Sequence, residues 1–576
     1  MSSKEDKQEA KQEDKQEDKQ EDKQNEQHED KQNEQHEDEV KGESEIELNR
    51  NDGKQVDKQL GEAKEGSVPV TPSKSSNDVK EVINNPSITD EVKFGLLCAK
   101  IMSIASSPES NQNINEITDE ILHLLITDDL QRIKKPETLR LFFRDYVKML
   151  PSKLVAEILS VLIAVLKKSL LNLEAAKGLL LDSLTQTFHF DNLIKHFIRE
   201  IISSLTAYSC DVKELKAILK QSEEDPRLLH YVRSANLLQR GRPNAFFAFP
   251  GSRGSVIALP PIQKWPTQSG WTFITWFRLE PNSTNAQPYL YYFKTSKSGL
   301  GYSAHFTGNC LVLTSMKIKG KGFQHCIPYE FAPFKWFHCA ITYITKWRGA
   351  EIKVYVNGQQ TANTEMAWQV TTNDPFDKCI IGGTAEMDEA HLFSGQMAAI
   401  YMFHETLNPS QICAIHRLGP SYMGQYRYSN ESYIDLPAMM RRVLYEEKLS
   451  SALISLYTPV AVEEDTLCLQ SAPKGNTSYF TSSPHAALLG STVAISTQSI
   501  SATLQSIGGI KALLPLLHRF TQKCDPEACS TLIGFICDLL ENSPQWFGNE
   551  VIQSHGFVII ASLLSKNPRL LINEET

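Results

Sequence analysis

The stretch GWTFITWFRLEP, residues 270–281, places two tryptophans, two phenylalanines, an isoleucine and a leucine within twelve residues. In a strand, Trp271 and Phe273 point to one face, and Ile274 and Trp276 point to the other. Rings that stack on a sugar or dip into a membrane need an exposed loop or edge, whereas this stretch is apolar on both faces. We therefore predict a strand covered on both sides, in the core of a sheet structure.

The same type of pattern extends from about residue 241 to 408, where short aromatic and β-branched segments alternate with Gly, Asn and Pro. Asn357-Gly358 has the composition of a tight hairpin turn with two positive φ angles. Many short strands indicate an antiparallel sandwich. The predicted strands are 255–259, 271–279, 288–295, 301–306, 310–316, 336–344, 351–357, 379–382 and 395–403.

The segments on both sides of this region have helical periodicity. Between residues 91 and 240, apolar positions in KLVAEILSVLIAVLKKSLLNL recur at helical spacing. Thr118 is a predicted helix N-cap before an acidic first turn. Near the end, GGIKALLPLL (508–517) and HGFVIIASLL (555–564) align at an offset of 47 residues, a period of the HEAT/armadillo type. These patterns predict α-solenoid segments.

We therefore predict a multidomain α plus β protein in which armadillo/HEAT-like segments flank an antiparallel β-sandwich. The predicted domains are an acidic low-complexity disordered tail (1–90), an armadillo-like helical region (91–240), the sandwich (241–420) and a second armadillo-like region (421–576). No polar cap follows the last repeat, so we expect the last region to be incomplete, either as a fragment or with a partner covering its open end.

Charge and cysteine content limit the class of protein. Residues 1–90 carry 14 Lys+Arg and 26 Asp+Glu, and the other 486 residues are nearly neutral with 45 and 43. A nucleic-acid partner is therefore not expected. The 11 cysteines have no repeated spacing and the N-terminus has no apolar signal segment, which favours a soluble, cytoplasmic chain with reduced thiols. We expect no cofactor.

Five uncommon stretches then give the chain a family resemblance: IALPPIQKWPTQSGWTF, KTSKSGLGYSAHFTGNCL, KGKGFQHC, FDKCIIGG and SPHAALL. In this order they resemble the N-terminal half of the neurobeachin family, the BEACH-domain group that also includes the lipopolysaccharide-responsive beige-like anchor protein. The resemblance covers roughly residues 91–576. It implies a concanavalin A-like, or laminin-G-like, sandwich between armadillo-like helices. The tail with its repeated KQED departs from the pattern that we expect of the family.

The resemblance also implies a function. It suggests a non-enzymatic scaffold for vesicle and membrane-protein trafficking that is cytoplasmic and peripherally associated with endomembranes. Its partners would be proteins of unknown identity. Some members of the family anchor the regulatory subunit of protein kinase A, but the helix for that contact is not identified in this chain, so no residue receives this role.

A patch of three lysines is the candidate binding site that the sequence indicates. Lys317, Lys319 and Lys321 have the period of two that puts three ammonium groups on one face of a strand or hairpin. Such a patch attracts anionic lipid headgroups or an acidic partner segment. Lysines that protect an edge strand from pairing are the alternative. Charge reversal of the three lysines should abolish binding to anionic liposomes.

Two other functional classes stay open. A calcium-dependent, carbohydrate-binding lectin-like protein is the main alternative, with acidic loops at 372–377 and 386–389 as the places for hard-oxygen ligands. A glycoside hydrolase would need two carboxylates about 5–10 Å apart, and the placed strands show no such inward pair. Cys524, Cys529 and Cys537 lack zinc-site spacing, and we expect no metal there.

Overall fold

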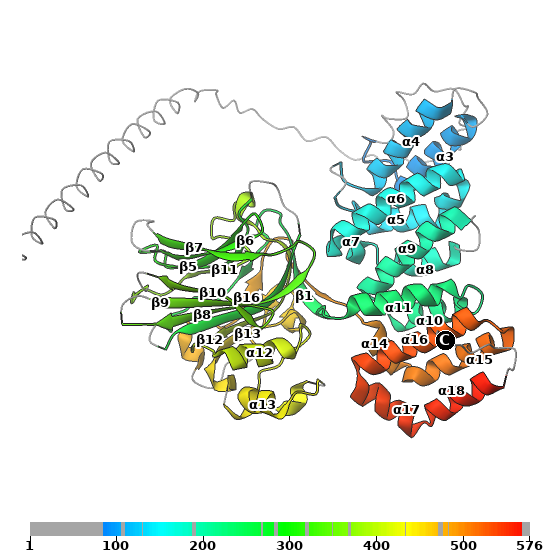
Figure 1. Ribbon diagram of the computed structural model, residues 1–576. Helices are drawn as coiled ribbons and strands as arrows, with labels where there is room; N and C mark the ends of the chain where they lie inside the picture. Colours follow the sequence, from blue (N-terminus) through cyan, green and yellow to red (C-terminus); the bar gives the residue numbers. More distant parts are fainter. Residues whose placement is uncertain are drawn as a thin grey trace, which may run out of the picture. The chain divides into compact units, whose positions relative to one another are not determined.

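The computed structural model of the chain (Figure 1) describes residues 84–104, 110–128, 131–186, 192–266, 269–280, 286–316, 322–347, 350–366, 370–432, 434–447, 449–470, 476–481 and 483–566. Only residues 84–90 of the predicted acidic tail belong to these ranges, so the disorder predicted for residues 1–90 stays a prediction.

Helices fill the described part of the chain before the sandwich. The turns η1 (Phe142–Tyr146) and η2 (Val147–Met149) follow α5. The helix α6 buries the apolar positions that the periodicity predicted. Thr118 lies inside α4 and does not begin a helix, because the helix already runs from Ser110. The helices are α3 (Asp90–Ile104), α4 (Ser110–Leu125), α5 (Pro136–Leu141), α6 (Ser152–Lys168), α7 (Leu170–Ala175), α8 (Leu179–Gln186), α9 (Asn192–Tyr208), α10 (Val212–Gln221) and α11 (Arg227–Gln239).

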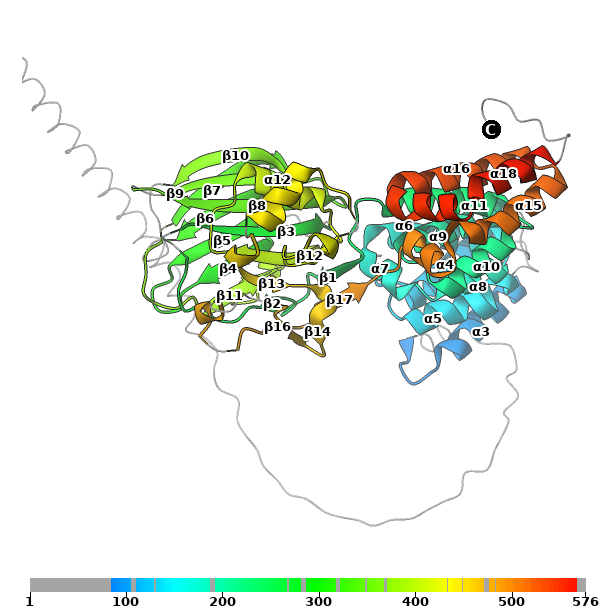
Figure 2. The same ribbon diagram turned by 90° about the horizontal axis from the view of Figure 1, so that it is seen from below.

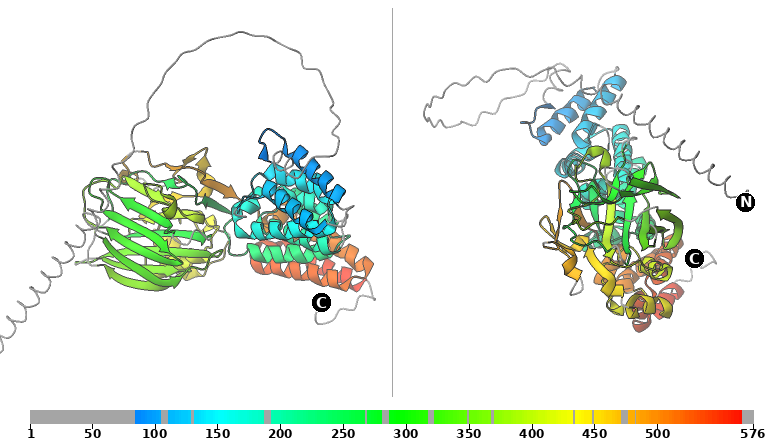
Figure 3. Two further views of the ribbon diagram at one scale, coloured as in Figure 1. Left: turned by 90° about the horizontal axis from the view of Figure 1, so that it is seen from above. Right: turned by 90° about the vertical axis from the view of Figure 1, so that its left-hand side faces the viewer.

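The C-terminal helices continue the same array (Figure 3, orange and red). One apolar core contains side chains from both sets of helices, such as Val232 of α11 and Leu532 of α16. A short ion pair joins Arg233 Nε of α11 to Asp538 Oδ2 of α16 at 2.5 Å. The sandwich is therefore an insertion into one helical array. The later elements are α14 (Ile500–Ser506), η10 (Gly509–Leu513), α15 (Leu514–Lys523), α16 (Pro526–Asn542), η11 (Pro544–Gly548), α17 (Asn549–Gln553) and α18 (Gly556–Ser565).

The inserted region is a sandwich of two antiparallel sheets, which confirms the predicted architecture (Figure 2). The first sheet has the order β10-β9-β8-β3-β12-β1-β17, with β13 also paired to β12. Its strands are β1 (Ala245–Pro250), β3 (Trp271–Leu279), β8 (Trp336–Thr345), β9 (Ala350–Val356), β10 (Gln359–Met366), β12 (Ser394–Phe403), β13 (Leu453–Tyr457) and β17 (Val493–Ser496).

The second sheet has the order β14-β15-β16-β2-β11-β4-β5-β6-β7. All nine strands predicted from the sequence are present in the two sheets, and Asn357 and Gly358 have the positive φ angles predicted for the turn between β9 and β10. The strands are β2 (Ile257–Ala258), β4 (Tyr289–Lys294), β5 (Gly301–Thr307), β6 (Cys310–Met316), β7 (Gly322–Glu330), β11 (Lys378–Ile381), β14 (Val462–Glu463), β15 (Thr466–Leu467) and β16 (Ala486–Leu488).

The sandwich does not end at the predicted boundary of residue 420. Strand β13 pairs with β12, and β17 pairs with β1, so the chain enters and leaves the insertion on two adjacent strands. The prediction that an armadillo-like region begins at residue 421 and runs to 576 is therefore wrong at its start, because helices of the array resume only at Ile500. The β13 sequence LISLY is a short apolar run, and periodicity alone cannot distinguish such a run from part of a buried helix.

The stretch GWTFITWFRLEP forms the doubly covered strand that its alternating side chains predicted. Trp271, Phe273 and Phe277 of β3 are in the core between the sheets. Ile274 points to the outer face, where α12 (Pro409–Arg417) and the segment after it cover the sheet. The strand is thus buried on both sides because one face meets the opposite sheet and the other meets a helix.

A buried polar cluster joins the end of β3 to the helical array. The Glu280 carboxylate accepts hydrogen bonds from Ser169 Oγ (2.7 Å) and Leu170 N (3.0 Å), at the start of α7. It also accepts bonds from Arg278 Nη1 (2.7 Å) and Gln396 Nε2 (2.8 Å). Burial lowers the pKa of Arg278, and the attraction of Glu280 opposes that shift. Glu280 thereby satisfies the Leu170 amide, one of the N–H groups in the first turn of α7 that have no partner within the helix.

Among the residues that the structure describes, no single helix combines the length and apolar composition needed to cross a membrane; the bent pair Ile500–Ser506 and Gly509–Lys523 meets those two criteria only when taken together.

Candidate functional site

The predicted lysine patch cannot be placed. Lys317, Lys319 and Lys321 belong to residues 317–321, which lie outside the described residues. The strands on either side are described, and Met316 of β6 pairs with Gly322 of β7. The binding role of the three lysines therefore stays a prediction.

Histidine and cysteine side chains that are close in the sequence lie in separate environments. His338 is buried on the outer face of the first sheet, where its ring lies 5.3 Å from that of Trp276, whereas Cys339 is in the core between the sheets. Cys529 is buried, while Cys524 and Cys537 are exposed. Within the described ranges, no group of three or more His, Cys, Asp or Glu side chains is placed to hold a metal ion.

In each of the two acidic loops considered for calcium, one carboxylate is engaged in a protein contact. The Asp377 carboxylate accepts a hydrogen bond from Ser296 N at 2.7 Å, and hydrogen bonds from Ser296 help to hold the Asp377 pKa below its usual range. Glu386 lies 3.5 Å from Lys378 Nζ. Calcium would have to compete with these contacts for the same oxygens.

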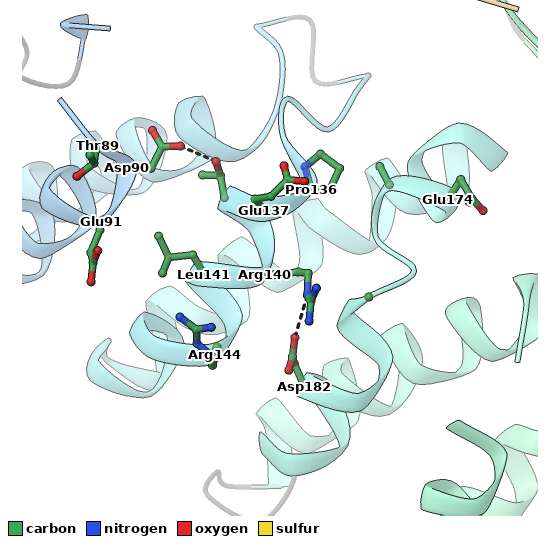
Figure 4. A pocket seen from close by; sticks show the side chains of 13 residues that line it. Thr89, Asp90, Glu91, Pro136, Glu137, Arg140, Leu141, Arg144, Glu174 and Asp182 are labelled. Atoms are coloured by element: carbon green, nitrogen blue, oxygen red, sulfur yellow. Dashed lines mark hydrogen bonds and ion pairs between the residues drawn. The ribbon is translucent and has the colours of Figure 1, made fainter. Parts of the chain in front are cut away.

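Among the residues that the structure describes, we take as the candidate binding site a cavity of about 660 Å³ among the N-terminal helices (Figure 4). It brings together the start of α3, the helix α5, the end of α7 and the helix α8. Residues that are almost a hundred positions apart in the sequence therefore share one hollow. Its walls are Thr89, Asp90, Glu91, Pro136, Glu137, Thr138, Arg140, Leu141, Arg144, Glu174, Ala175, Gly178 and Asp182.

The cavity is acidic. Its lining contains five carboxylates and two guanidinium groups. Arg140 Nε lies 3.5 Å from Asp182 Oδ2, and Arg144 forms a closer ion pair with Asp145. Both arginines thus have a carboxylate partner, and Lys135 and Lys177 lie 3.8 Å from Asp90 and 4.0 Å from Glu174. The lining itself still contains more carboxylates than guanidinium groups.

Several carboxylates are held in position. Thr138 Oγ1 donates to Asp90 Oδ2 at 2.5 Å, which ties α5 to the first residue of α3. Tyr208 OH donates to Glu174 Oε2 at 2.8 Å. Burial, followed by the Glu174 charge, raises the pKa of Tyr208, so its hydroxyl stays a donor. Glu91 of α3 and Glu137 of α5 line the hollow from two separate helices (Figure 4).

The sequence contained no signal for this cavity. Its carboxylates are scattered over four helices, and acidic residues on a helix surface are common. Only the packing of α3, α5, α7 and α8 decides which of them face the same space. The Glu280 cluster likewise forms only through the packing of distant segments, although Glu280 itself belongs to the stretch GWTFITWFRLEP.

Two family models match the chain. The model described as Neurobeachin/BDCP, DUF4704 alpha solenoid region matches residues 478–576. The model described as Concanavalin A-like lectin/glucanases superfamily matches residues 251–413. The first match falls on the C-terminal helices and the strands just before them. The second match lies within the sandwich.

Similar proteins occur in nematodes and a plant. The chain is 36% identical over 493 residues to a protein named as a neurobeachin homolog in Caenorhabditis elegans, which covers 81% of this chain and 19% of the relative. A Caenorhabditis briggsae protein with the same name is 35% identical over 503 residues, with the same coverage. BEACH domain-containing protein B of Arabidopsis thaliana is 26% identical over 234 residues, covering 37% of this chain and 9% of that protein. The chain thus spans about a fifth of the length of its nematode relatives.

Proposed function

This chain belongs to the neurobeachin family, and from that premise we propose that it is a non-enzymatic scaffold in intracellular vesicle and membrane-protein trafficking. The helical array would bind partner proteins, and the inserted sandwich would present further surfaces. We expect a cytoplasmic location with peripheral association to endomembranes. Kinase anchoring would be a property of the longer family members and is assigned to no residue here.

The acidic cavity of the helical array is the observation that carries this proposal. Stacked helices form extended surfaces that bind peptides and helices. A hollow of about 660 Å³ has the size of a pocket that takes several side chains. Its excess of carboxylates favours a partner segment that presents lysine or arginine. Apolar surface from Leu141, Pro136 and Ala175 would pack against the stems of those long side chains.

Charge reversal in the cavity tests this function. The variant with Glu91→Lys and Glu137→Lys should recover at least about tenfold less partner protein from cytosol than the parent chain, because two attractions become repulsions. The matched control combines Glu116→Lys and Glu157→Lys, which are exposed on α4 and α6 and lie outside the cavity. Recovery would be quantified by mass spectrometry. Equal recovery with both double variants would reject the cavity as the docking site.

A calcium-dependent lectin-like function is the second candidate, because the family model of the sandwich is described as a lectin and glucanase superfamily. This function predicts that calcium raises the melting temperature of the chain and that a chelator lowers it. It also predicts calcium-dependent signals on a glycan array. An unchanged melting temperature in chelator, together with a blank array, would leave the scaffold as the only candidate.

A further inference from the structure

Another pocket lies where three segments that are distant in the sequence meet. It has a volume of about 360 Å³ and is lined mainly by residues from the end of α11 and the chain after it, from the segment after α12, and from the start of α14. Its described lining contains two arginines, four serines, two asparagines and a glutamine, but no aspartate or glutamate. The charge of this lining therefore has the opposite sign to that of the acidic cavity.

Arg242 lines this pocket without a counter-charge. Its Nη2 group donates a hydrogen bond to the Tyr208 carbonyl oxygen, and its guanidinium carbon lies 5.4 Å from the centre of the Tyr208 ring. Within the described part of the chain, the ion pairs of the neighbouring arginines involve Asp538 and Glu280, and none includes Arg242. Burial lowers the pKa of Arg242 to about 10, the Tyr208 side chain opposes that shift, and the charge of Arg278 adds to it. Arg242 therefore stays protonated at neutral pH, and no described carboxylate balances its charge.

The other charges at this pocket do not remove the excess of positive charge. Arg240, which also lines the pocket, donates from Nη2 to the Asp538 carbonyl oxygen at 3.0 Å and lies 3.9 Å from Asp538 Oδ1. The other oxygen of that carboxylate already pairs with Arg233 at 2.5 Å. Arg233, Arg240 and Arg242 thus bring three positive charges and Asp538 brings one negative charge, which leaves a net charge of +2.

Uncharged hydrogen-bond donors line the same pocket. Asn236 is 2% exposed, and its Nδ2 atom has no hydrogen-bond partner among the described residues. Ser499 Oγ accepts a hydrogen bond from Ala502 N at 3.2 Å, which leaves the hydroxyl proton of Ser499 available to an acceptor. A buried donor or charge without a partner is costly, so a ligand with several acceptor oxygens would be stabilised in this pocket.

We propose that this pocket binds one phosphate monoester group, carried by a phosphorylated serine or threonine of a partner protein. A phosphorylated side chain brings a charge of about −1.5 to −2 and three acceptor oxygens, which match the excess of positive charge and the unpaired donors. Guanidinium groups suit phosphate because their N–H groups form paired hydrogen bonds with its oxygens. The identity of the carrier rests on the proposed scaffold function, because a scaffold binds partner proteins.

Charge and size favour one phosphate over other anions. A carboxylate side chain would balance only half of the net charge of the pocket, and an inositol polyphosphate would bring far more negative charge than the pocket balances. A volume of about 360 Å³ is at the small end of the range for ligand pockets, so it fits one phosphorylated side chain better than a large ligand.

Binding of N-acetyl-O-phosphoserine methylamide to the full chain tests the proposal. Isothermal titration calorimetry should show saturable binding, and the melting temperature should rise with the concentration of this compound. N-acetylserine methylamide should do neither, because it lacks the phosphate. The Arg242→Gln variant should bind the phosphorylated compound at least about tenfold more weakly, because it loses a charged donor.

A second variant keeps the test decisive if Arg242→Gln does not fold. Ser421 is exposed and lines the pocket, and its Oγ donates to the Arg242 carbonyl oxygen at 3.4 Å. Ser421→Glu places a carboxylate beside the arginines, where it competes with the phosphate. This variant should also bind N-acetyl-O-phosphoserine methylamide at least about tenfold more weakly. Circular dichroism would establish that each variant is folded.

The matched control is Arg519→Gln, since the Arg519 side chain is 61% exposed on α15 and lies outside the pocket. It should bind like the parent chain. Absence of binding by the parent chain, or unchanged binding by either pocket variant, would overturn the proposal. Equally tight binding of inorganic phosphate would overturn the phosphorylated side chain as the ligand and assign the pocket to free phosphate. This titration uses no partner protein, so its failure is distinct from a failure of the scaffold function in the cavity assay.

Discussion

Glu280 should be among the most costly positions of the chain to change. Its side chain is 4% exposed and that of its partner Arg278 is 7% exposed. Replacement by alanine removes the acceptor for Arg278, Gln396, Ser169 and the Leu170 amide, and leaves a buried guanidinium without its counter-charge. Breaking such a buried pair from one side costs about 3–5 kcal/mol of unfolding free energy.

Urea unfolding of the Glu280→Ala variant would measure this loss. Tryptophan fluorescence follows mainly the sandwich, and far-ultraviolet circular dichroism follows mainly the helices. Because Glu280 joins the two, the transitions seen by the two probes should separate in the variant and coincide more closely in the parent chain. The Arg278→Ala variant should lose a similar amount. The double variant should lose less than the sum, by about 0.5–3 kcal/mol, because both substitutions remove the same interaction.

Glu365→Ala is the control for Glu280→Ala. The Glu365 side chain is 79% exposed and pairs with Lys346 at the surface, so its loss should cost no more than about 1 kcal/mol. The reasoning is refuted if Glu280→Ala costs no more than Glu365→Ala, or if the effects of the Glu280 and Arg278 substitutions are simply additive.

Three further predictions concern other parts of the fold. Gly270 has a φ of +77°, and a Cβ added there would lie 2.2 Å from Tyr343 O. Gly254 has a similar φ of +78°, but a Cβ added there would have no neighbour within 4 Å. Gly270→Ala should therefore lower the melting temperature much more than Gly254→Ala. Burial lowers the pKa of His338 to about 3, so below about pH 6.5 the unfolded chain takes up a proton that the folded chain does not bind. The unfolding free energy should therefore fall by about 1.4 kcal/mol per pH unit between pH 6 and 4 from this group, and His338→Leu should reduce that slope in urea titrations. Asp538→Ala removes the carboxylate that pairs with Arg233 of α11, so the unfolding free energy measured in urea should fall by about 1.5–3 kcal/mol. Replacement of the exposed Glu541 on the same helix by alanine should change the unfolding free energy little. Equal losses in the two variants would argue against a structural role for the Arg233–Asp538 ion pair.

The sequence predicted the elements whose evidence is local. The two faces of β3, the hairpin turn at Asn357-Gly358 and the apolar stripe of α6 all follow from side-chain periodicity or turn chemistry. Prediction failed where the local signal was ambiguous. AFFAFP stood among turn-forming residues, yet it forms the buried strand β1, and β7 and β10 carry too many polar residues to be recognised as strands.

The functional surfaces could be predicted less well. The lysines chosen from the sequence lie outside the described residues. The cavity depends on carboxylates between positions 90 and 182 that meet only through helix packing.

By itself, the sequence determined that helices surround an antiparallel sandwich, because periods of 3.6 and 2 are properties of short segments. Only the tertiary structure decided that the sandwich is inserted into one helical array, with β1 and β17 paired as its entry and exit. It also decided that Glu280 accepts from the α7 N-terminus, 110 residues away. The physical reason is that apolar faces and unpaired polar groups must be covered, and the partner that covers them is chosen by the packing of distant segments.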